Sequence, residues 1–288
     1  MKKQKTYNKI SDELFQEAII EYRDNNMSLR KIQEKYKINR HILSKKLEEA
    51  GIKKTKGNHY RYYFHNFDYF EVIDSHSKAY WLGFIMADGY IQRNKGVNYG
   101  EDRVGINLNV GDIDTLKSFK QEIGATNPIK VYEEKTPQSW IGKGWSEKST
   151  MCRILLNSQK TVDDLIDKGV IYNKSLTKEF VGYDKVPEKY IYSYLRGYMD
   201  GNGYIFLRKT KNYGYQSQLS IHSSKKFSYW ISSFGDSIVR KDKRNNGWKV
   251  VFKTKSSIDL LDKIYESSTE ETRMKRKYEK YKKCKNDE

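Results

Sequence analysis

The chain has 288 residues, of which 55 are Lys or Arg and 37 are Asp or Glu, giving a formal net charge of +18. Such an excess of positive charge favours a polyanionic partner such as nucleic acid, because binding releases condensed counterions. No apolar run is long enough to span a membrane, and the isolated Cys152 and Cys284 exclude a disulfide framework and a structural zinc site, so we expect a cytoplasmic protein.

Residues 1–52 are predicted to form three short helices. Helix starts are indicated at Ser11, Ser28 and Asn39, whose side-chain oxygens can accept hydrogen bonds from the first free N–H groups of a helix. Three helices with a tight turn between the last two are typical of a helix-turn-helix, whose third helix enters the major groove of DNA. The alternative is an ordinary three-helix bundle with a basic surface. The candidate DNA contacts on the third helix are Arg40, His41, Ser44 and Lys45.

Residues 53–75 are predicted to form a linker that mixes basic and aromatic side chains. Basic groups in it, Arg61 among them, can follow a phosphate backbone. Its second part is too apolar for a free tether. We therefore expect it to dock on the next domain through Phe67, Tyr69, Phe70 and Ile73.

Two later segments of the chain are similar to each other. They are YWLGFIMADGYI at residues 80–91 and YLRGYMDGNGYI at residues 194–205. Each reads as an apolar helix that ends at a glycine and leads into a strand. The repeat predicts two similar halves, at residues 76–185 and 186–288, that meet through these two helices.

Both motif helices have a stripe of small residues. Gly83 and Ala87 lie four positions apart in the first helix, as do Gly197 and Gly201 in the second. Small residues let two helix backbones approach closely, so we expect the two helix ends to meet. Asp88 then places a carboxylate at a helix C-terminus, where the helix dipole disfavours negative charge. A bound cation would offset that cost, so the position of Asp88 indicates a metal.

The elements that follow each motif helix have the same order in both halves. In the first half, strands are predicted at residues 90–94, 103–110, 128–132 and 151–157, and helices at residues 112–124 and 161–167. In the second half, strands are predicted at residues 204–209, 216–222, 237–241 and 248–253, with helices after Ser223-Ser224 and after Ser256-Ser257. The fold class is therefore α+β, with two pseudo-symmetric αββαββα halves whose helices cover one face of each sheet.

The other face of each predicted sheet is polar, because polar and apolar residues alternate along the strands. Its donors, acceptors and cations suit base edges and phosphates in a major groove. A solvated sheet face is the alternative, but the duplication favours a long, saddle-shaped surface for double-stranded DNA. The candidate contacts on the strands are Gln92, Arg103, Asn107, Asn109, Arg153, Arg208, Gln216, Gln218, Ser220, His222, Lys249 and Lys253.

The paired motifs and their matching downstream elements resemble the LAGLIDADG homing endonucleases over about residues 76–283. The resemblance implies a single-chain monomer, Mg²⁺ as cofactor, and double-strand cleavage of a long asymmetric DNA target. It also implies that each motif helix delivers a metal-binding residue to one catalytic site. Asp88 stands at the first such position and Asn202 at the second. The basic residues expected to stabilise charge on the scissile phosphate match Lys174 and Lys277.

Asn202 departs from the family pattern, which usually has Asp or Glu at this position. An amide oxygen can bind Mg²⁺, but the site loses one negative charge, so we expect weaker metal binding and slow or single-strand cleavage. Either a natural degenerate copy or a deliberate Asp-to-Asn change fits the sequence. Asp200 lies about 200° around the helix from Asn202, so we expect it to have a structural role.

A second interpretation of the function stays open. A non-cleaving DNA-binding regulator or an intron-splicing maturase with the same fold is the alternative to a nuclease. Other enzyme classes lack their motifs, because the five histidines are scattered and no GxxxxGK[ST] or GxSxG segment occurs. Cleavage of DNA that has an intact insertion site would separate a nuclease from the alternative.

Overall fold

The structure is a computed structural model that describes residues 11–23, 27–50, 63–93, 101–136, 146–174, 182–210, 214–242 and 247–285. It separates into two compact units, with a boundary between Tyr63 and Phe64. This boundary falls inside the predicted linker. Residues 53–62, with the candidate contact Arg61, lie outside the described residues, and the predicted domain bounds stay a prediction.

The first unit contains three helices that begin where the sequence predicts. They are α1 (Asp12–Arg23), α2 (Leu29–Tyr36) and α3 (Arg40–Glu49). The Ser28 hydroxyl and the Asn39 side-chain oxygen each accept a hydrogen bond from a first-turn N–H, at 3.2 and 2.8 Å. Lys37 has a φ of 54° in the turn between α2 and α3. This left-handed residue ends α2 and is followed by the buried Ile38, which anchors the turn in the core.

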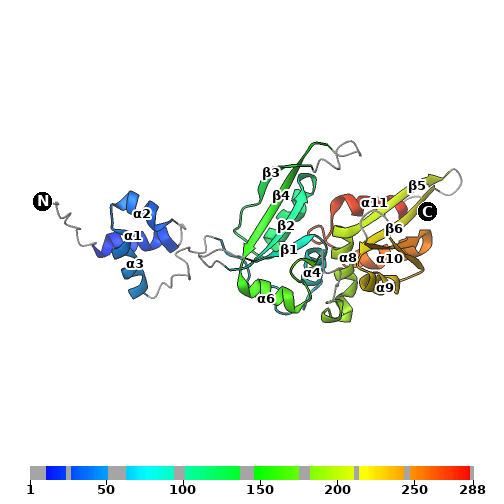
Figure 1. Ribbon diagram of the computed structural model, residues 1–288, viewed down its shortest axis with the longest axis horizontal. Helices are drawn as coiled ribbons and strands as arrows, with labels where there is room; N and C mark the ends of the chain where they lie inside the picture. The colour runs from blue at the N-terminus through cyan, green and yellow to red at the C-terminus, as the bar shows by residue number, and fades with distance from the viewer. Residues whose placement is uncertain are drawn as a thin grey trace. The chain divides into compact units, whose positions relative to one another are not determined.

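The second unit contains two halves with the same order of elements (Figure 1). The first half contains α4 (His76–Asp88), β1 (Gly89–Gln92), β2 (Arg103–Asn109), the 3₁₀ turn η1 (Val110–Asp112), α5 (Ile113–Glu122), β3 (Lys130–Lys135), β4 (Lys148–Asn157) and α6 (Gln159–Asp167). The second half contains α8 (Ile191–Asn202), β5 (Gly203–Thr210), β6 (Gly214–Ser223), α9 (Lys225–Ser232), β7 (Ser237–Lys241), β8 (Trp248–Lys253), α10 (Thr254–Glu266) and α11 (Lys275–Lys285). The predicted αββαββα order is confirmed in both halves, and in the part of the chain that the structure describes the second half continues into α11.

Several predicted element bounds differ from the structure, and two of the differences concern how elements connect or pair. The strand predicted at residues 128–132 begins at Lys130 and continues to Lys135, where it pairs with an extended β4. The helix predicted to follow Ser256-Ser257 begins at Thr254, directly after β8. Because no residue separates this strand from the helix, the two serines lie in the first helical turn instead of capping it.

Each half forms a four-stranded antiparallel sheet, with the strand orders β1-β2-β4-β3 and β5-β6-β8-β7. The register pairs Ile106 with Ile154 in the first sheet and Ile221 with Val250 in the second, and all four are buried. Residues directly opposite each other share a sheet face, so these pairs define the apolar face that the helices cover. One continuous core joins the two halves through α4 and α8.

The segment before α4 packs on the first half, as the sequence predicts. Tyr69, Phe70 and Ile73 are buried in the same core as α4. The Tyr69 hydroxyl donates a hydrogen bond to Glu122 Oε1 at 2.9 Å, and the Thr126 N–H donates to the Phe64 carbonyl at 2.8 Å. Among the helices that the structure describes, none is both long and apolar enough to cross a bilayer.

Candidate active site

The candidate site is built on the contact between α4 and α8, which pack together between the two sheets (Figure 1). A Cβ on Gly83 would stand 2.0 Å from the Tyr194 carbonyl oxygen, and a Cβ on Gly197 would stand 1.9 Å from the Tyr80 carbonyl oxygen. A side chain therefore fits at neither position, and the two backbones touch. The contact is reciprocal, as expected for two halves related by a pseudo-two-fold axis.

The close packing continues to the C-terminal ends of these helices. A Cβ on Gly201 would meet the Ala87 Cβ at 2.3 Å and Asp88 Oδ2 at 3.2 Å. The Asp88 carboxylate therefore lies against the last turn of α8, where Asn202 ends the helix. Burial raises the pKa of the neighbouring Tyr198 hydroxyl to about 12, and the Asn202 side chain acts to lower it. The structure thus brings the elements that hold the two predicted metal-binding positions together.

Lys174 and Lys277 are buried at these same helix ends, with 6% and 3% of their surface exposed. Lys174 Nζ donates hydrogen bonds to the Met86 and Ala87 carbonyl oxygens at 2.5 and 2.6 Å. Lys277 Nζ donates in the same way to two carbonyl oxygens near the end of α8, at 2.8 and 2.5 Å. Each ammonium group therefore binds carbonyl oxygens in the last turn of a motif helix, where the helix C-terminus leaves most of them free.

Burial and charge oppose each other in this cluster. Burial raises the pKa of the Asp88 carboxyl, while the charges of Lys277, Lys174 and Arg276 act to lower it. Burial also lowers the pKa of both lysines to about 8, although Asp88 acts to raise each of them. Positive charge is thus already present where the helix dipole disfavours Asp88. The position of Asp88 alone therefore does not indicate a metal. The evidence for a metal site comes instead from the chemistry of the donor atoms.

The donor atoms fit a hard divalent cation. Asp88 supplies a carboxylate and Asn202 an amide oxygen, and Mg²⁺ commonly binds one or two carboxylates while keeping several waters. Within the described residues, no cluster of three or more His, Cys, Asp or Glu could hold a metal. An ion bound at these two residues would therefore keep much of its coordination shell as water.

Asp200 faces away from this site, in agreement with the structural role expected for it. Its Oδ2 accepts hydrogen bonds from the Tyr80 hydroxyl at 3.0 Å and from the Met274 N–H at 2.8 Å. Burial raises the pKa of this carboxyl to about 6, while Lys277 and Arg196 are among the groups that act to lower it. Asp200 thus joins α8 to α4 and to the segment before α11.

Arg196 is a fully buried residue of α8 that the sequence reasoning missed. Its guanidinium donates to the Thr272 and Ile264 carbonyl oxygens at 2.8 and 2.6 Å, and it lies 5.3 Å from the Tyr80 ring. Leu82 occupies the equivalent place in the first motif. The signal available in the sequence was therefore an arginine at the place where the first motif has a leucine.

Replacing Arg196 with Leu is expected to lower the free energy of unfolding by about 3–5 kcal/mol, because it leaves two buried carbonyl oxygens without their donor and removes a positive charge that favours ionised Asp200. Urea denaturation measures this loss. Arg240→Leu, at an exposed position of β7, is the control and should change the stability by less than about 0.5 kcal/mol. Equal losses in the two variants would contradict the role given to Arg196.

A charged pair also links the two halves beside the site, and the sequence reasoning missed it. Arg276 Nε and Nη2 donate to the two carboxylate oxygens of Asp112 at 2.8 and 3.0 Å. The pair joins η1 of the first half to α11 of the second and lies at a cavity of about 630 Å³.

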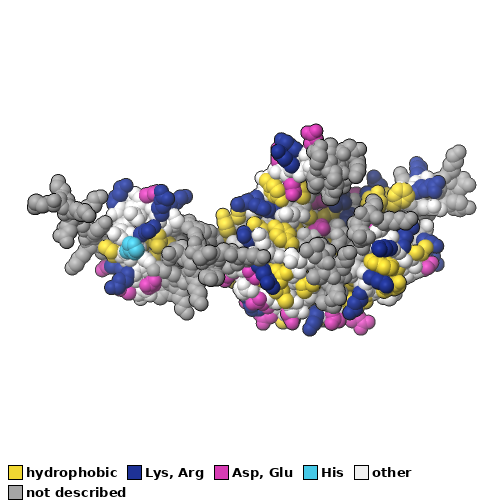
Figure 2. Space-filling view, in the orientation of Figure 1, with side chains coloured by type: hydrophobic (Ala, Val, Ile, Leu, Met, Phe, Trp, Pro, Cys, Tyr) yellow, Lys and Arg dark blue, Asp and Glu magenta, His cyan; other side chains and the backbone are white. Residues whose placement is uncertain are grey.

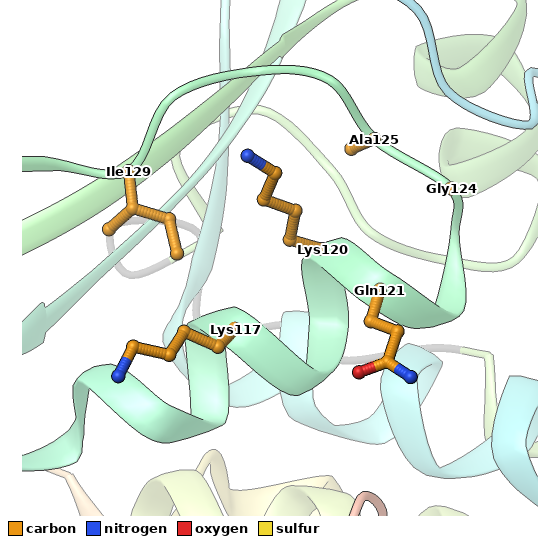
Figure 3. Close-up of a pocket in the computed structure, with 6 residues that line it drawn as sticks. All are labelled: Lys117, Lys120, Gln121, Gly124, Ala125 and Ile129. Carbon is orange, nitrogen blue, oxygen red and sulfur yellow. The ribbon is translucent and has the colours of Figure 1, made fainter.

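A smaller hollow of about 340 Å³ lies between α5 and the loop before β3 (Figure 3), where Lys117, Lys120 and Ile129 form part of its wall. None of the four predicted catalytic residues lines either cavity.

The predicted strand contacts share the sheet face opposite the helices. Cross-strand pairing joins Gln92 to Arg103 and Asn107 to Arg153 in the first sheet. In the second sheet it joins Arg208 to Gln216, Gln218 to Lys253 and His222 to Lys249. By register the same faces also carry residues that the sequence reasoning missed, among them Lys130, Tyr132, Tyr204, Phe206 and Arg240.

The third helix of the first unit presents its candidate contacts outward. Arg40, His41 and Lys45 are exposed on α3, and Ser44 is partly exposed. Lys and Arg side chains are spread over both units on the face shown in Figure 2. Acidic side chains gather along the lower edge of the larger unit in that view.

Comparisons with known proteins identify structural neighbours. The meganuclease I-SmaMI bound to an uncleaveable DNA is 15% identical, with a TM-score of 0.45, over 72% of this chain and 88% of that chain. The LAGLIDADG homing endonuclease I-GzeII in complex with its DNA target is 14% identical, with a TM-score of 0.45, over 72% and 88% of the two chains. The homing endonuclease I-WcaI bound to its DNA recognition sequence is 14% identical, with a TM-score of 0.47, over 73% and 90%.

These neighbours are homing endonucleases. I-GzeII is described as a LAGLIDADG homing endonuclease, which is the family that the two motif segments of this chain resemble. No protein-family model matches the chain, and no curated protein matches it.

Proposed function

We propose that this chain is a LAGLIDADG homing endonuclease that binds a long, asymmetric DNA duplex and hydrolyses its phosphodiester bonds with Mg²⁺. The observation that carries the proposal is the close meeting of α4 and α8 at Asp88 and Gly201, beside Asn202. Two sheets with polar outer faces flank this meeting point. Because one chain contains both halves, a monomer completes the site.

Four residues have proposed roles in the reaction. Asp88 and Asn202 would hold the metal, which would supply a Lewis acid for the phosphate and for an attacking water. Lys174 and Lys277 hold the helix ends in place through their carbonyl hydrogen bonds. Their positive charges also help to stabilise negative charge that develops on the scissile phosphate.

The two units are proposed to bind DNA in different ways. The sheet faces supply side chains for base edges and phosphates in the major groove, while the metal site acts on the backbone between them. The first unit is proposed as a helix-turn-helix in which Arg40, His41, Ser44 and Lys45 of α3 contact a further stretch of major groove. Together they recognise a longer target than the two halves alone.

Replacing Asp88 with Asn tests the proposed active site, because it removes the carboxylate among the four proposed catalytic residues. The change is best made in a protein that already carries Asn202→Asp, so that the reference protein has high activity. Cleavage of a target plasmid should fall at least about 100-fold, since the metal supplies several kcal/mol of transition-state stabilisation. DNA affinity measured in Ca²⁺ should change less than about threefold.

Asp114→Asn is the matched control for this variant, because Asp114 is an exposed carboxylate on α5. It should leave both cleavage and binding unchanged. Full cleavage by the Asp88→Asn variant would contradict the assignment of the site.

Replacing Lys253 with Ala tests the proposed DNA-binding face. Each phosphate contact adds about one unit to the slope of log affinity against log salt concentration, so the slope should fall by about 1. Fluorescence anisotropy over a series of KCl concentrations measures it. Lys226→Ala, on the exposed surface of α9, is the control and should leave the slope unchanged. Equal slopes for Lys253→Ala and the unmodified chain would contradict a phosphate contact at this residue.

Asn202 is the observation that favours a second candidate, a non-cleaving DNA-binding regulator or an RNA-splicing maturase. With one carboxylate at the proposed metal site, binding could persist where cleavage does not. Specific DNA binding without cleavage, both before and after Asn202→Asp, would support the regulator. Preferential binding of intron RNA would support the maturase.

A further inference from the structure

The two sheet faces differ at one pair of equivalent tyrosines. Tyr90 and Tyr204 each lie two residues beyond the end of a motif helix. Tyr90 pairs across the sheet with Gly105, and a Cβ on that glycine would lie 2.3 Å from the Tyr90 Cζ. The Tyr90 ring therefore lies flat over Gly105. Tyr204 instead pairs with Ser220, whose Cβ occupies that space. Tyr204 is 50% exposed, and Lys280 Nζ lies 4.5 Å from the centre of its ring.

The first sheet face presents two arginines beside the flat Tyr90 ring. Arg103 and Arg153 share the face with Tyr90, and within the described residues the buried Nε of each has no hydrogen-bond partner. The Arg153 guanidinium lies 5.0 Å from the centre of the Tyr132 ring, which restricts its orientation. A planar guanidinium fork matches the O6 and N7 acceptors of guanine.

The second sheet face carries two large exposed apolar side chains among its polar ones. Phe206, two residues after Tyr204 on β5, is 46% exposed, and Ile238 on β7 is 47% exposed. Gln92 is the first-half equivalent of Phe206. Large exposed apolar groups on an otherwise polar face indicate a contact surface. The apolar group that a major groove offers to such side chains is the C5-methyl group of thymine.

We propose that the two halves recognise different bases, an inference that rests on the proposed DNA endonuclease function. The first half reads guanine through Arg103 and Arg153. The second half reads thymine methyl groups through Tyr204 and Phe206. The two arms of the target therefore differ in base composition, guanine facing the first sheet and thymine facing the second.

A binding selection from a random duplex library tests this inference. Ca²⁺ replaces Mg²⁺, so that selection depends on binding and not on cleavage. Arg153→Lys keeps the charge but removes the planar fork, and it should lower the preference for guanine at one position about tenfold or more. Phe206→Ser should weaken a thymine preference on the other side of the centre of the target. Tyr229→Ser, at a 55% exposed aromatic of α9, is the control and should change no base preference.

An exchange of the two small residues tests the role of the tyrosines. Gly105→Ser should lift the Tyr90 ring and weaken the guanine preference, because the tip of that ring is what a new Cβ would meet. Ser220→Gly should let the Tyr204 ring lie flat and weaken a thymine preference. Urea denaturation checks that each variant is folded before selection.

The outcomes separate this inference from the proposed function. Enriched targets without guanine on one side and thymine on the other would overturn the inference and leave the endonuclease proposal standing. The same holds if Arg153→Lys and Phe206→Ser alter the same side of the target. A library from which no sequence is enriched would overturn both.

Discussion

Replacing Asn202 with Asp is expected to raise Mg²⁺-dependent cleavage of a cognate plasmid at least about 100-fold, since each 1.36 kcal/mol of barrier is a factor of ten and a well-held metal supplies several kcal/mol. The change puts a second carboxylate on the helix end that meets Asp88. Two carboxylates hold Mg²⁺ more tightly than one carboxylate and an amide. Agarose gels that resolve supercoiled, nicked and linear DNA measure the rate, and linear product should replace nicked product.

Metal binding provides a measurement that does not depend on cleavage. A ligand that binds only the folded state stabilises it, so Mg²⁺ should raise the melting temperature of the Asn202→Asp variant more than that of the unmodified chain. Gln121→Glu adds an acidic group at an exposed position of α5 and is the control for added charge. A variant that gains neither activity nor thermal stabilisation by Mg²⁺ would contradict the assignment of Asn202 to the metal site.

Placing a methyl group at Gly83 or Gly197 is expected to lower the free energy of unfolding by about 3 kcal/mol or more. The new Cβ would lie 2.0 or 1.9 Å from a carbonyl oxygen of the facing helix, so one backbone has to move. Alanine has a higher helix propensity than glycine by about 1 kcal/mol, so propensity alone predicts the opposite sign. Urea denaturation of Gly83→Ala and Gly197→Ala therefore separates the two effects.

Gly111→Ala is the matched control for these two variants. A Cβ at this exposed glycine would meet only the Asn109 side-chain oxygen, at 3.3 Å, which can rotate away. Its effect on stability should stay below about 1 kcal/mol. In the Asn202→Asp background, Gly83→Ala should also slow cleavage, because α4 and α8 position the two metal ligands. A stability gain in Gly83→Ala would show that the helices do not pack through this contact.

Most of the fold could be predicted from local patterns. The caps at Ser28 and Asn39 are read from residue type and spacing, and alternation along β2 separates its apolar and polar faces. Element bounds were less predictable. α10 includes Ser256 and Ser257 because it follows β8 without a loop, a connection that side-chain propensities do not reveal.

The meeting of the two motif helices was predicted, whereas most contacts at the candidate site were not. The glycine spacing indicated that two helices would meet, and the structure shows Gly83 and Gly197 against facing carbonyls. The buried positions of Lys174 and Lys277 under the helix ends could not be predicted, because lysines are usually solvated and Lys277 also stands in a charged stretch. The pairing of Arg276 with Asp112 of the other half could not be predicted either, because the two residues lie 164 positions apart in the chain.

The sequence by itself determined the duplication, the order of elements, the polar sheet faces and the unequal residues at positions 88 and 202, because each depends on spacing within one short segment. Only the tertiary structure decided that Asp200 and Arg196 join α8 to its neighbours and that Tyr90 lies flat where Tyr204 stands exposed. The physical reason is that these features depend on atoms brought together from distant parts of the chain. Burial, hydrogen bonding and the room that one Cβ occupies are settled only when those parts pack.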